Sequence, residues 1–202
     1  GDDVIQFVDV GARGGLPPHW HWLAPKLHLT MFEPDPAEAA ELRIHTASLI
    51  QNCSIVETAV WNGPGKHVLK LTRSGGASSL LEPNRDFVDD FPDEDRFDVL
   101  KRFELDTNAL DDVLDPGIAY DFLKIDVQDG SLMVLEGAQN YLDGLFGLEV
   151  ETEFAELYKG EPLFGAVHQY LTGRQFELVD VRANYWQRTD ARDVPGCRGQ
   201  AI

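Results

Sequence analysis

A glycine-rich turn directly after an apolar strand constrains this chain more than any other feature. Residues 4–8 form the apolar run Val-Ile-Gln-Phe-Val, and residues 9–15 continue as Asp-Val-Gly-Ala-Arg-Gly-Gly. Phe7, Val8 and Val10 predict a buried strand, and the glycines predict a sharp turn where backbone can lie against a ligand. The order of strand, acid and glycine turn fits either a cofactor-binding loop or a plain structural turn.

Asp9, the acid in this turn, limits the class of ligand that the turn can bind. Turns that bind dinucleotides usually space their glycines as GxGxxG, whereas this turn reads D-x-G-x-x-x-G. A carboxylate at Asp9 would repel a pyrophosphate, but it suits the sulfonium and amino groups of S-adenosylmethionine. A nicotinamide oxidoreductase is therefore disfavoured, and it would also need a hydride-transfer pair such as Tyr-x-x-x-Lys.

Strands and helices alternate along the rest of the chain. We expect strands at 26–32, 53–60, 67–71, 97–105, 121–127, 145–150 and 176–181, and helices after 17–18, at 35–49, at 107–114, from 131 and at 162–172. The polar, acidic segment 73–96 predicts a long mobile loop. Such alternation predicts an α/β fold, with a mostly parallel sheet covered by helices on both faces.

Length and charge limit the domain count and the partners. The 202 residues predict a single domain spanning 1–202, and the net charge of -18 should repel nucleic acid and anionic membranes. No apolar run is long enough to span a bilayer. Cys53 and Cys197 lack zinc or redox spacing, so we expect a cytoplasmic protein. Because residues 4–8 already predict a core strand, we also expect a segment to precede them in the complete protein.

Four acids lie at or just after the ends of expected strands, namely Asp9, Glu33, Asp126 and Glu151. In a parallel α/β sheet, ligands bind outside the carboxyl ends of the strands. Glu33 follows the glycine turn by about twenty residues, the spacing at which an acid accepts hydrogen bonds from a ribose diol. Together with Asp9 and Gly11, it favours a nucleoside-type ligand over a structural turn, although strand-end acids also cap helices.

The chain resembles FkbM-type S-adenosylmethionine-dependent methyltransferases along nearly its whole length. The matching pieces are Phe7–Ala12 with Gly15, Phe32–Pro34, Thr58–Val60 with Gly65, Ser78–Leu80, Leu110–Asp111, Asp121–Val127 and Val134–Ala138. The resemblance implies a Rossmann-like class I methyltransferase sheet of seven strands, with S-adenosylmethionine as cofactor. It also implies methyl transfer to a hydroxyl of a sugar or other small metabolite. The cofactor-binding residues that we expect are Asp9, Gly11, Ala12, Arg13, Gly15, Glu33, Pro34, Ala59, Val60, Ser79 and Asp126.

One segment departs from the family pattern. After residues 124–127 the family usually continues with an acid and then a glycine, whereas this chain has Gln128-Asp129-Gly130-Ser131. An acid is lost at 128 and the glycine is displaced, which alters the substrate side of the site. A methyltransferase-like binding module without catalysis is therefore an alternative to the enzyme.

Methyl transfer requires the protein to position the acceptor and to remove its proton. His19 and His21, in the segment after the glycine turn, are candidates for the base, and an exposed helix start is the structural alternative. Asp126 and Lys124 are further candidates on the same side of one strand. We favour Asp126 as the more important residue, because its strand fixes it at the ligand-binding edge, where its carboxylate would hold the acceptor hydroxyl or the cofactor. We expect no metal.

Overall fold

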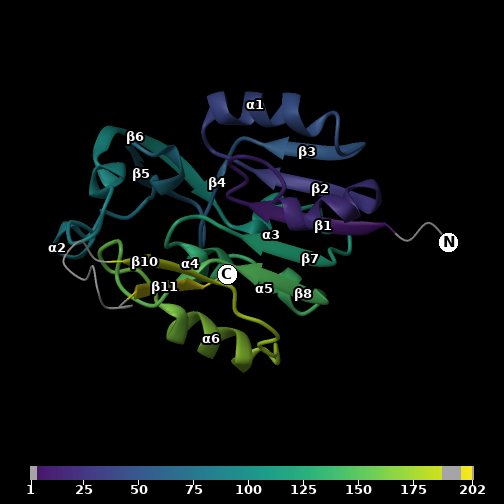
Figure 1. Ribbon diagram of the computed structural model, residues 1–202. Coiled ribbons are helices and arrows are strands. Elements are labelled where there is room, and N and C mark those ends of the chain that lie inside the picture. The colour runs from purple at the N-terminus through teal and green to yellow at the C-terminus, as the bar shows by residue number, and fades with distance from the viewer. Residues whose placement is uncertain (1–3, 188–196, 202) are drawn as a thin grey trace. The chain divides into compact units, whose positions relative to one another are not determined.

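The computed structural model describes residues 4–187 and 197–201, without the side chains of 183–187 and 197–201 (Figure 1). These residues form two compact units. The first unit comprises residues 1–65, 106–126 and 133–149, and the second comprises 66–105, 127–132 and 150–202. No helix in the described part of the chain has both the length and the apolar character needed to cross a membrane.

A five-stranded sheet with the order β3-β2-β1-β7-β8 forms the centre of the fold (Figure 1). Its strands are β1 (Ile5–Val10), β2 (Leu27–Phe32), β3 (Asn52–Val56), β7 (Phe122–Ile125) and β8 (Gly147–Val150). Strand β1 pairs in parallel with β2 on one side and with β7 on the other. The parallel α/β sheet is confirmed, whereas the expected total of seven strands is not.

Short-range signals in the sequence determine where several elements begin. Helix α1 (Pro36–Thr46) has Asp35 as its N-cap, because the Asp35 side chain accepts a hydrogen bond from the amide of Ala37. Pro18 opens a 3-10 helix, η1 (Pro18–Lys26). The further short helices of the chain are α3 (Leu110–Val113), α4 (Ser131–Glu136) and α5 (Gln139–Leu142).

The helix expected from residue 131 is interrupted at Gly137, between α4 and α5. A Cβ on Gly137 would lie 2.2 Å from the carbonyl oxygen of Trp61. The backbone of Trp61 therefore approaches Gly137 as closely as only a glycine allows.

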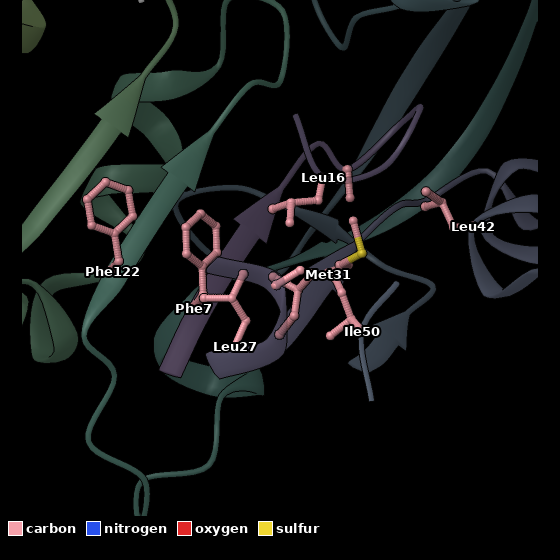
Figure 2. Packing of buried hydrophobic residues seen from close by; sticks show 10 residues of the cluster. Phe7, Leu16, Leu27, Met31, Leu42, Ile50 and Phe122 are labelled. Atoms are coloured by element: carbon pink, nitrogen blue, oxygen red, sulfur yellow. The ribbon is translucent and has the colours of Figure 1, made fainter. Parts of the chain in front are cut away.

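The apolar core of the first unit lies against β1, β2 and β7 (Figure 2). Phe7 stacks on Phe122 with ring centroids 5.2 Å apart, and Trp20 meets both rings edge-on. Leu27 and Met31 on β2 are almost completely buried in the same cluster. The aromatic contacts tie η1, which carries Trp20, to the sheet.

The strand expected over 53–60 is wrong in its length, because the chain turns after Val56. The amide of Thr58 donates to the carbonyl of Val56 at 3.0 Å, which ends β3. The chain then forms β4 (Ala59–Val60), which belongs to a separate sheet with the order β4-β6-β5. Its partners are β5 (Gly65–Thr72) and β6 (Val99–Asn108).

The second unit contains two corrections to the expected elements. Segment 73–96 is not an open loop, because it contains η2 (Gly75–Ala77), α2 (Arg85–Val88) and the start of η3 (Glu94–Phe97). The strand expected at 176–181 is absent, and the chain is exposed there. The remaining elements of the chain are β9 (Thr152–Glu153), α6 (Phe164–Gly173), β10 (Ala183–Gln187) and β11 (Cys197–Ala201).

A small cluster around Tyr158 forms the core of the second unit. Ala77, Val88 and Tyr158 are completely buried, and Phe97 and Leu157 pack with them. The hydroxyl of Tyr158 donates to the carbonyl oxygen of Ala77 at 2.7 Å. Parts of segment 73–96 are therefore anchored in this core.

Candidate functional site

The glycine turn after β1 is bonded to the end of β2. Gly11 and Gly15 have positive φ angles of 78° and 85°, which place them in the left-handed region that glycine adopts without strain. The amides of Gly11 and Ala12 both donate to the carbonyl oxygen of Phe32 at 3.1 Å. Since Glu33 follows Phe32, these bonds fix the turn next to the acid that the sequence predicts for a ribose.

The sequence alone did not single out Gly14, which also has a positive φ of 79°. An added Cβ on Gly14 would meet no atom within 4 Å. Its amide donates to Oε1 of Glu38 at 3.2 Å. A positive φ next to open space marks the part of the turn where a ligand has room, and three glycines within five residues are the signal that could have found it.

Arg13, predicted to bind the cofactor, contacts the start of α1. Its guanidinium lies 3.1 Å from Oδ2 of Asp35 and 3.0 Å from Oε2 of Glu38. These two carboxylates neutralise the positive charge that Arg13 brings to the turn. The side chain thus links the turn to α1, and its contact with a cofactor stays a prediction.

Glu33, the acid that follows β2, is buried. It is 4% exposed, and its Oε1 accepts the amide of Asp35 at 2.8 Å. Burial raises the pKa of Glu33, while the hydrogen bond from Asp35 and the charge of Arg13 oppose that rise. Pro34 follows directly, and it is half-buried. Glu33 is therefore held in a defined orientation by its own backbone turn.

Asp9 is also buried, and the cation beside it belongs to the protein. Lys124 on β7 places Nζ 2.9 Å from Oδ1 of Asp9, which is 0% exposed. Oδ2 of Asp9 is buried without a hydrogen-bond partner among the described residues. Asp9 therefore lies inside the core of the fold, where the ammonium group of Lys124 compensates its charge.

Lys124 lies on β7, Asp126 directly follows that strand, and their side chains lie close together. Nζ of Lys124 lies 3.6 Å from Oδ2 of Asp126, whose side chain is 38% exposed. Burial lowers the pKa of Lys124, but the carboxylates of Asp9 and Asp126 outweigh this effect and raise it. An ammonium held by two carboxylates would first have to lose its own proton, and the role of Lys124 as the base stays a prediction.

His19 is hydrogen-bonded to Glu149 on β8. Its Nε2 lies 3.1 Å from Oε2 of Glu149, and the histidine side chain is 42% exposed. The charge of Glu149 also acts on Asp9 and Lys124. The carboxylate that binds His19 therefore also contributes to the electrostatic environment of Asp9 and Lys124. The sequence did not identify Glu149 as the partner of His19, because no sequence pattern connects two residues that are 130 positions apart.

His21 has a different environment, although it lies two residues away. Its Nε2 donates to the carbonyl oxygen of Leu16 at 2.8 Å. A carbonyl can only accept, so this nitrogen carries a proton. Trp20 between the two histidines packs into the core, so this segment is partly anchored.

The remaining predicted site residues lie elsewhere. Ala59 and Val60 are buried in β4, which is outside the central sheet. Ser79 and Glu151 belong to the second unit. There the hydroxyl of Ser79 donates to the carbonyl of Gln128 at 3.0 Å. The roles of Ala59, Val60 and Ser79 in cofactor binding stay predictions.

The Tyr-x-x-x-Lys spacing of hydride-transfer enzymes does occur in this chain, at Tyr120 and Lys124. The hydroxyl of Tyr120 accepts the amide of Asp115, and Lys124 is paired with Asp9. The pair is therefore engaged in structural contacts.

A parallel sheet with a glycine turn after its first strand and an acid after its second defines a Rossmann-like α/β protein. The family model of the methyltransferase FkbM domain matches residues 9–178. The chain therefore belongs to the FkbM methyltransferase family. A search of curated proteins found no match.

Proposed function

We propose that the protein is an S-adenosylmethionine-dependent methyltransferase that acts on a hydroxyl group of a sugar or other small metabolite. The observation that carries this proposal is the bonding of the glycine turn to the end of β2, which holds Glu33 beside the turn. Membership of the FkbM family supports methyl transfer. The cofactor and the hydroxyl acceptor are the parts that require experiment.

The residues of the turn fit S-adenosylmethionine. The turn after β1 contains open space at Gly14, where backbone can approach a ligand. Glu33 would accept hydrogen bonds from the ribose hydroxyls, and the unpartnered Oδ2 of Asp9 favours a group that brings a donor. The positive charge of Arg13 is already neutralised by two carboxylates, so it does not oppose a cationic cofactor. When bound, the cofactor supplies an activated methyl group.

The groups of the chain that would handle the acceptor are His19 and Asp126. The proton on Nε2 of His19 bonds to Glu149, so Nδ1 is the nitrogen that can receive a proton from the acceptor hydroxyl. The carboxylate of Glu149 stabilises the histidine after it gains that proton. Asp126 lies close to Lys124 and is therefore better suited to orient the hydroxyl than to remove its proton. Orienting the acceptor is also the role that the sequence predicts for Asp126.

Calorimetric titration with S-adenosylmethionine tests the cofactor assignment. Glu33→Gln keeps an oxygen for the amide of Asp35 but removes the negative charge. We expect affinity to fall by about ten-fold to over a hundred-fold, since a hydrogen bond to a charged group is worth about 1.5–3 kcal/mol. Glu41→Gln, at an exposed position in α1, is the matched control and should leave the affinity unchanged. An unchanged affinity in Glu33→Gln would contradict the assignment.

Turnover separates the enzyme from a binding module. Once an acceptor is known, both Asp126→Asn and His19→Gln should lower turnover. Replacing His21 should have a smaller effect, because its Nε2 is bonded to backbone. Tight cofactor binding without turnover of any acceptor would favour the non-catalytic alternative.

A further inference from the structure

The glycine turn and the start of α1 are joined by a network of side chains with Arg13 at its centre. The guanidinium of Arg13 donates to Oδ2 of Asp35 at 3.1 Å, and its other terminal nitrogen lies 3.0 Å from Oε2 of Glu38. The side chains of Asp35 and Glu38 are 23% and 22% exposed, and that of Arg13 is 31% exposed. Because the guanidinium is planar and rigid, it can hold two carboxylates at once in a fixed geometry. Arg13 therefore fixes both carboxylates relative to the turn that carries it.

Each of the two carboxylate residues is also bonded to a part of the expected nucleoside site. The second oxygen of Glu38, Oε1, accepts the amide of Gly14 at 3.2 Å, at the part of the turn with open space. Asp35 donates its own amide to Oε1 of Glu33 at 2.8 Å. Glu33 is 4% exposed, so its carboxyl group has little freedom to turn once this oxygen is held. The turn and the expected ribose acid are thus connected to the same arginine, through Glu38 and through Asp35.

This network should contribute little to the stability of the fold as a whole. Partly exposed ion pairs add little to the free energy of unfolding, because water solvates the separated charges well. Oδ1 of Asp35 accepts the amide of Ala37, so α1 keeps its N-cap when Arg13 is removed. Ligand binding is more sensitive, because a ribose hydroxyl must meet a carboxylate oxygen at hydrogen-bonding distance and a pre-organised acid avoids the cost of ordering. The network therefore affects ligand binding more than folding.

We propose that Arg13 and its two carboxylate partners form a clamp, which holds Glu33 and the glycine turn in the arrangement that binds the ribose of a nucleoside. The members of the clamp, Arg13, Asp35 and Glu38, all belong to the first unit. Arg13 is a positioning residue in this clamp, because it acts on the ligand through Asp35 and Glu33. That the nucleoside is part of S-adenosylmethionine rests on the proposed function, whereas the clamp itself requires only a ligand with a ribose.

Adenosine and 2′-deoxyadenosine test the proposal, because they differ only in a ribose hydroxyl that Glu33 would bind. Both are uncharged, so the ratio of their affinities does not report the change of local charge when Arg13 is replaced. We expect the wild-type protein to bind adenosine about ten-fold to a hundred-fold more tightly, the range for a hydrogen bond to a charged group. Arg13→Ala should lower this ratio by about three-fold to ten-fold, within the range for residues coupled in one hydrogen-bond network. A wild-type protein that binds both equally or binds neither, or an unchanged ratio in Arg13→Ala, would overturn the proposal.

A double-variant cycle distinguishes positioning from direct contact with the ligand. Glu33→Gln removes the charge through which Arg13 is proposed to act, so adding Arg13→Ala to it should change the ratio little further. Full additivity of the two losses would mean that Arg13 acts independently of Glu33, and it would overturn the positioning role. Arg43→Ala is the matched control, since Arg43 also lies in an ion pair at α1, 2.6 Å from Glu57, and this variant should leave the ratio unchanged.

Hydrogen exchange tests the clamp without any ligand. The amides of Gly11 and Ala12 donate to the carbonyl of Phe32, so their protection reports how firmly the turn is held. Arg13→Ala and Glu38→Ala should each raise these exchange rates by about three-fold to ten-fold, with the circular dichroism of the fold retained. Unchanged exchange in either variant would overturn the clamp. A wild-type protein that fails to bind S-adenosylmethionine but prefers adenosine over 2′-deoxyadenosine would instead contradict the proposed function alone.

Discussion

The buried pair of Lys124 and Asp9 offers the sharpest test of how this site is held together. Nζ of Lys124 lies 2.9 Å from Oδ1 of Asp9 and 3.6 Å from Oδ2 of Asp126. Lys124→Met removes the cation and leaves a carboxylate that is 0% exposed without compensation. Removing one partner of a buried ion pair costs about 3–5 kcal/mol, and we expect a loss of unfolding free energy in that range.

Asp9→Asn should cost less than Lys124→Met. The variant keeps the shape of the side chain, and Asp126 remains to compensate the ammonium. The loss should be about 1.5–3 kcal/mol, as for a hydrogen bond to a charged group. In the double variant no buried charge is left unpaired, so its cost should be smaller than the sum by about 1–3 kcal/mol.

Urea unfolding, followed by circular dichroism and by tryptophan fluorescence, measures these differences. The pH dependence gives a second check on the same pair. The folded pKa of Lys124 is raised above its ordinary value of 10.5, so its contribution is fully present below that value and is lost only as the pH rises through the folded pKa. Additive costs in the double variant, or a Lys124→Met variant as stable as the wild type, would refute this reasoning.

Four further predictions concern other parts of the chain. Gly137→Ala should cost about 1–3 kcal/mol or more in urea unfolding, because its Cβ would lie 2.2 Å from a backbone oxygen of Trp61. Gly165→Ala, in α6 with open space around the new Cβ, should instead stabilise by about 0.5–1 kcal/mol. Asp129→Gly should raise thermal stability by about 1–2 kcal/mol, through relief of the positive φ, and lower stability would refute the strain. Hydrogen exchange at the buried parts of segment 73–96 should be slow even without ligand. Uniformly fast exchange would instead support the mobile loop that the sequence predicts.

Signals that act over a few residues were sufficient to predict much of the fold. Asp35 and Pro36 mark the start of α1, and the structure confirms both the cap and the helix. The glycines at 11 and 15 adopt the positive φ angles that a sharp turn requires. Such features depend on backbone conformations and contacts between near neighbours, so they can be recognised in the order of residues.

Tertiary contacts decided where expected elements are interrupted. β3 ends at Val56, although the apolar pattern continues to Val60, because the chain leaves the central sheet to pair with β6. The approach of Trp61 requires a glycine at 137, which interrupts a helix that periodicity predicts as continuous. Apolar residues at 176–181 resemble a strand, yet they find no partner strand in the described part of the chain. The positions at which these strands and helices end therefore depend on contacts with residues that are distant in the sequence.

The sequence by itself determined which acids lie at the strand ends, but it did not determine their partners. Lys124 and Asp9 are 115 positions apart, and His19 and Glu149 are 130 positions apart. The charge state of a carboxyl depends on its burial and on the charges within a few ångströms, and only the folded chain brings those charges together.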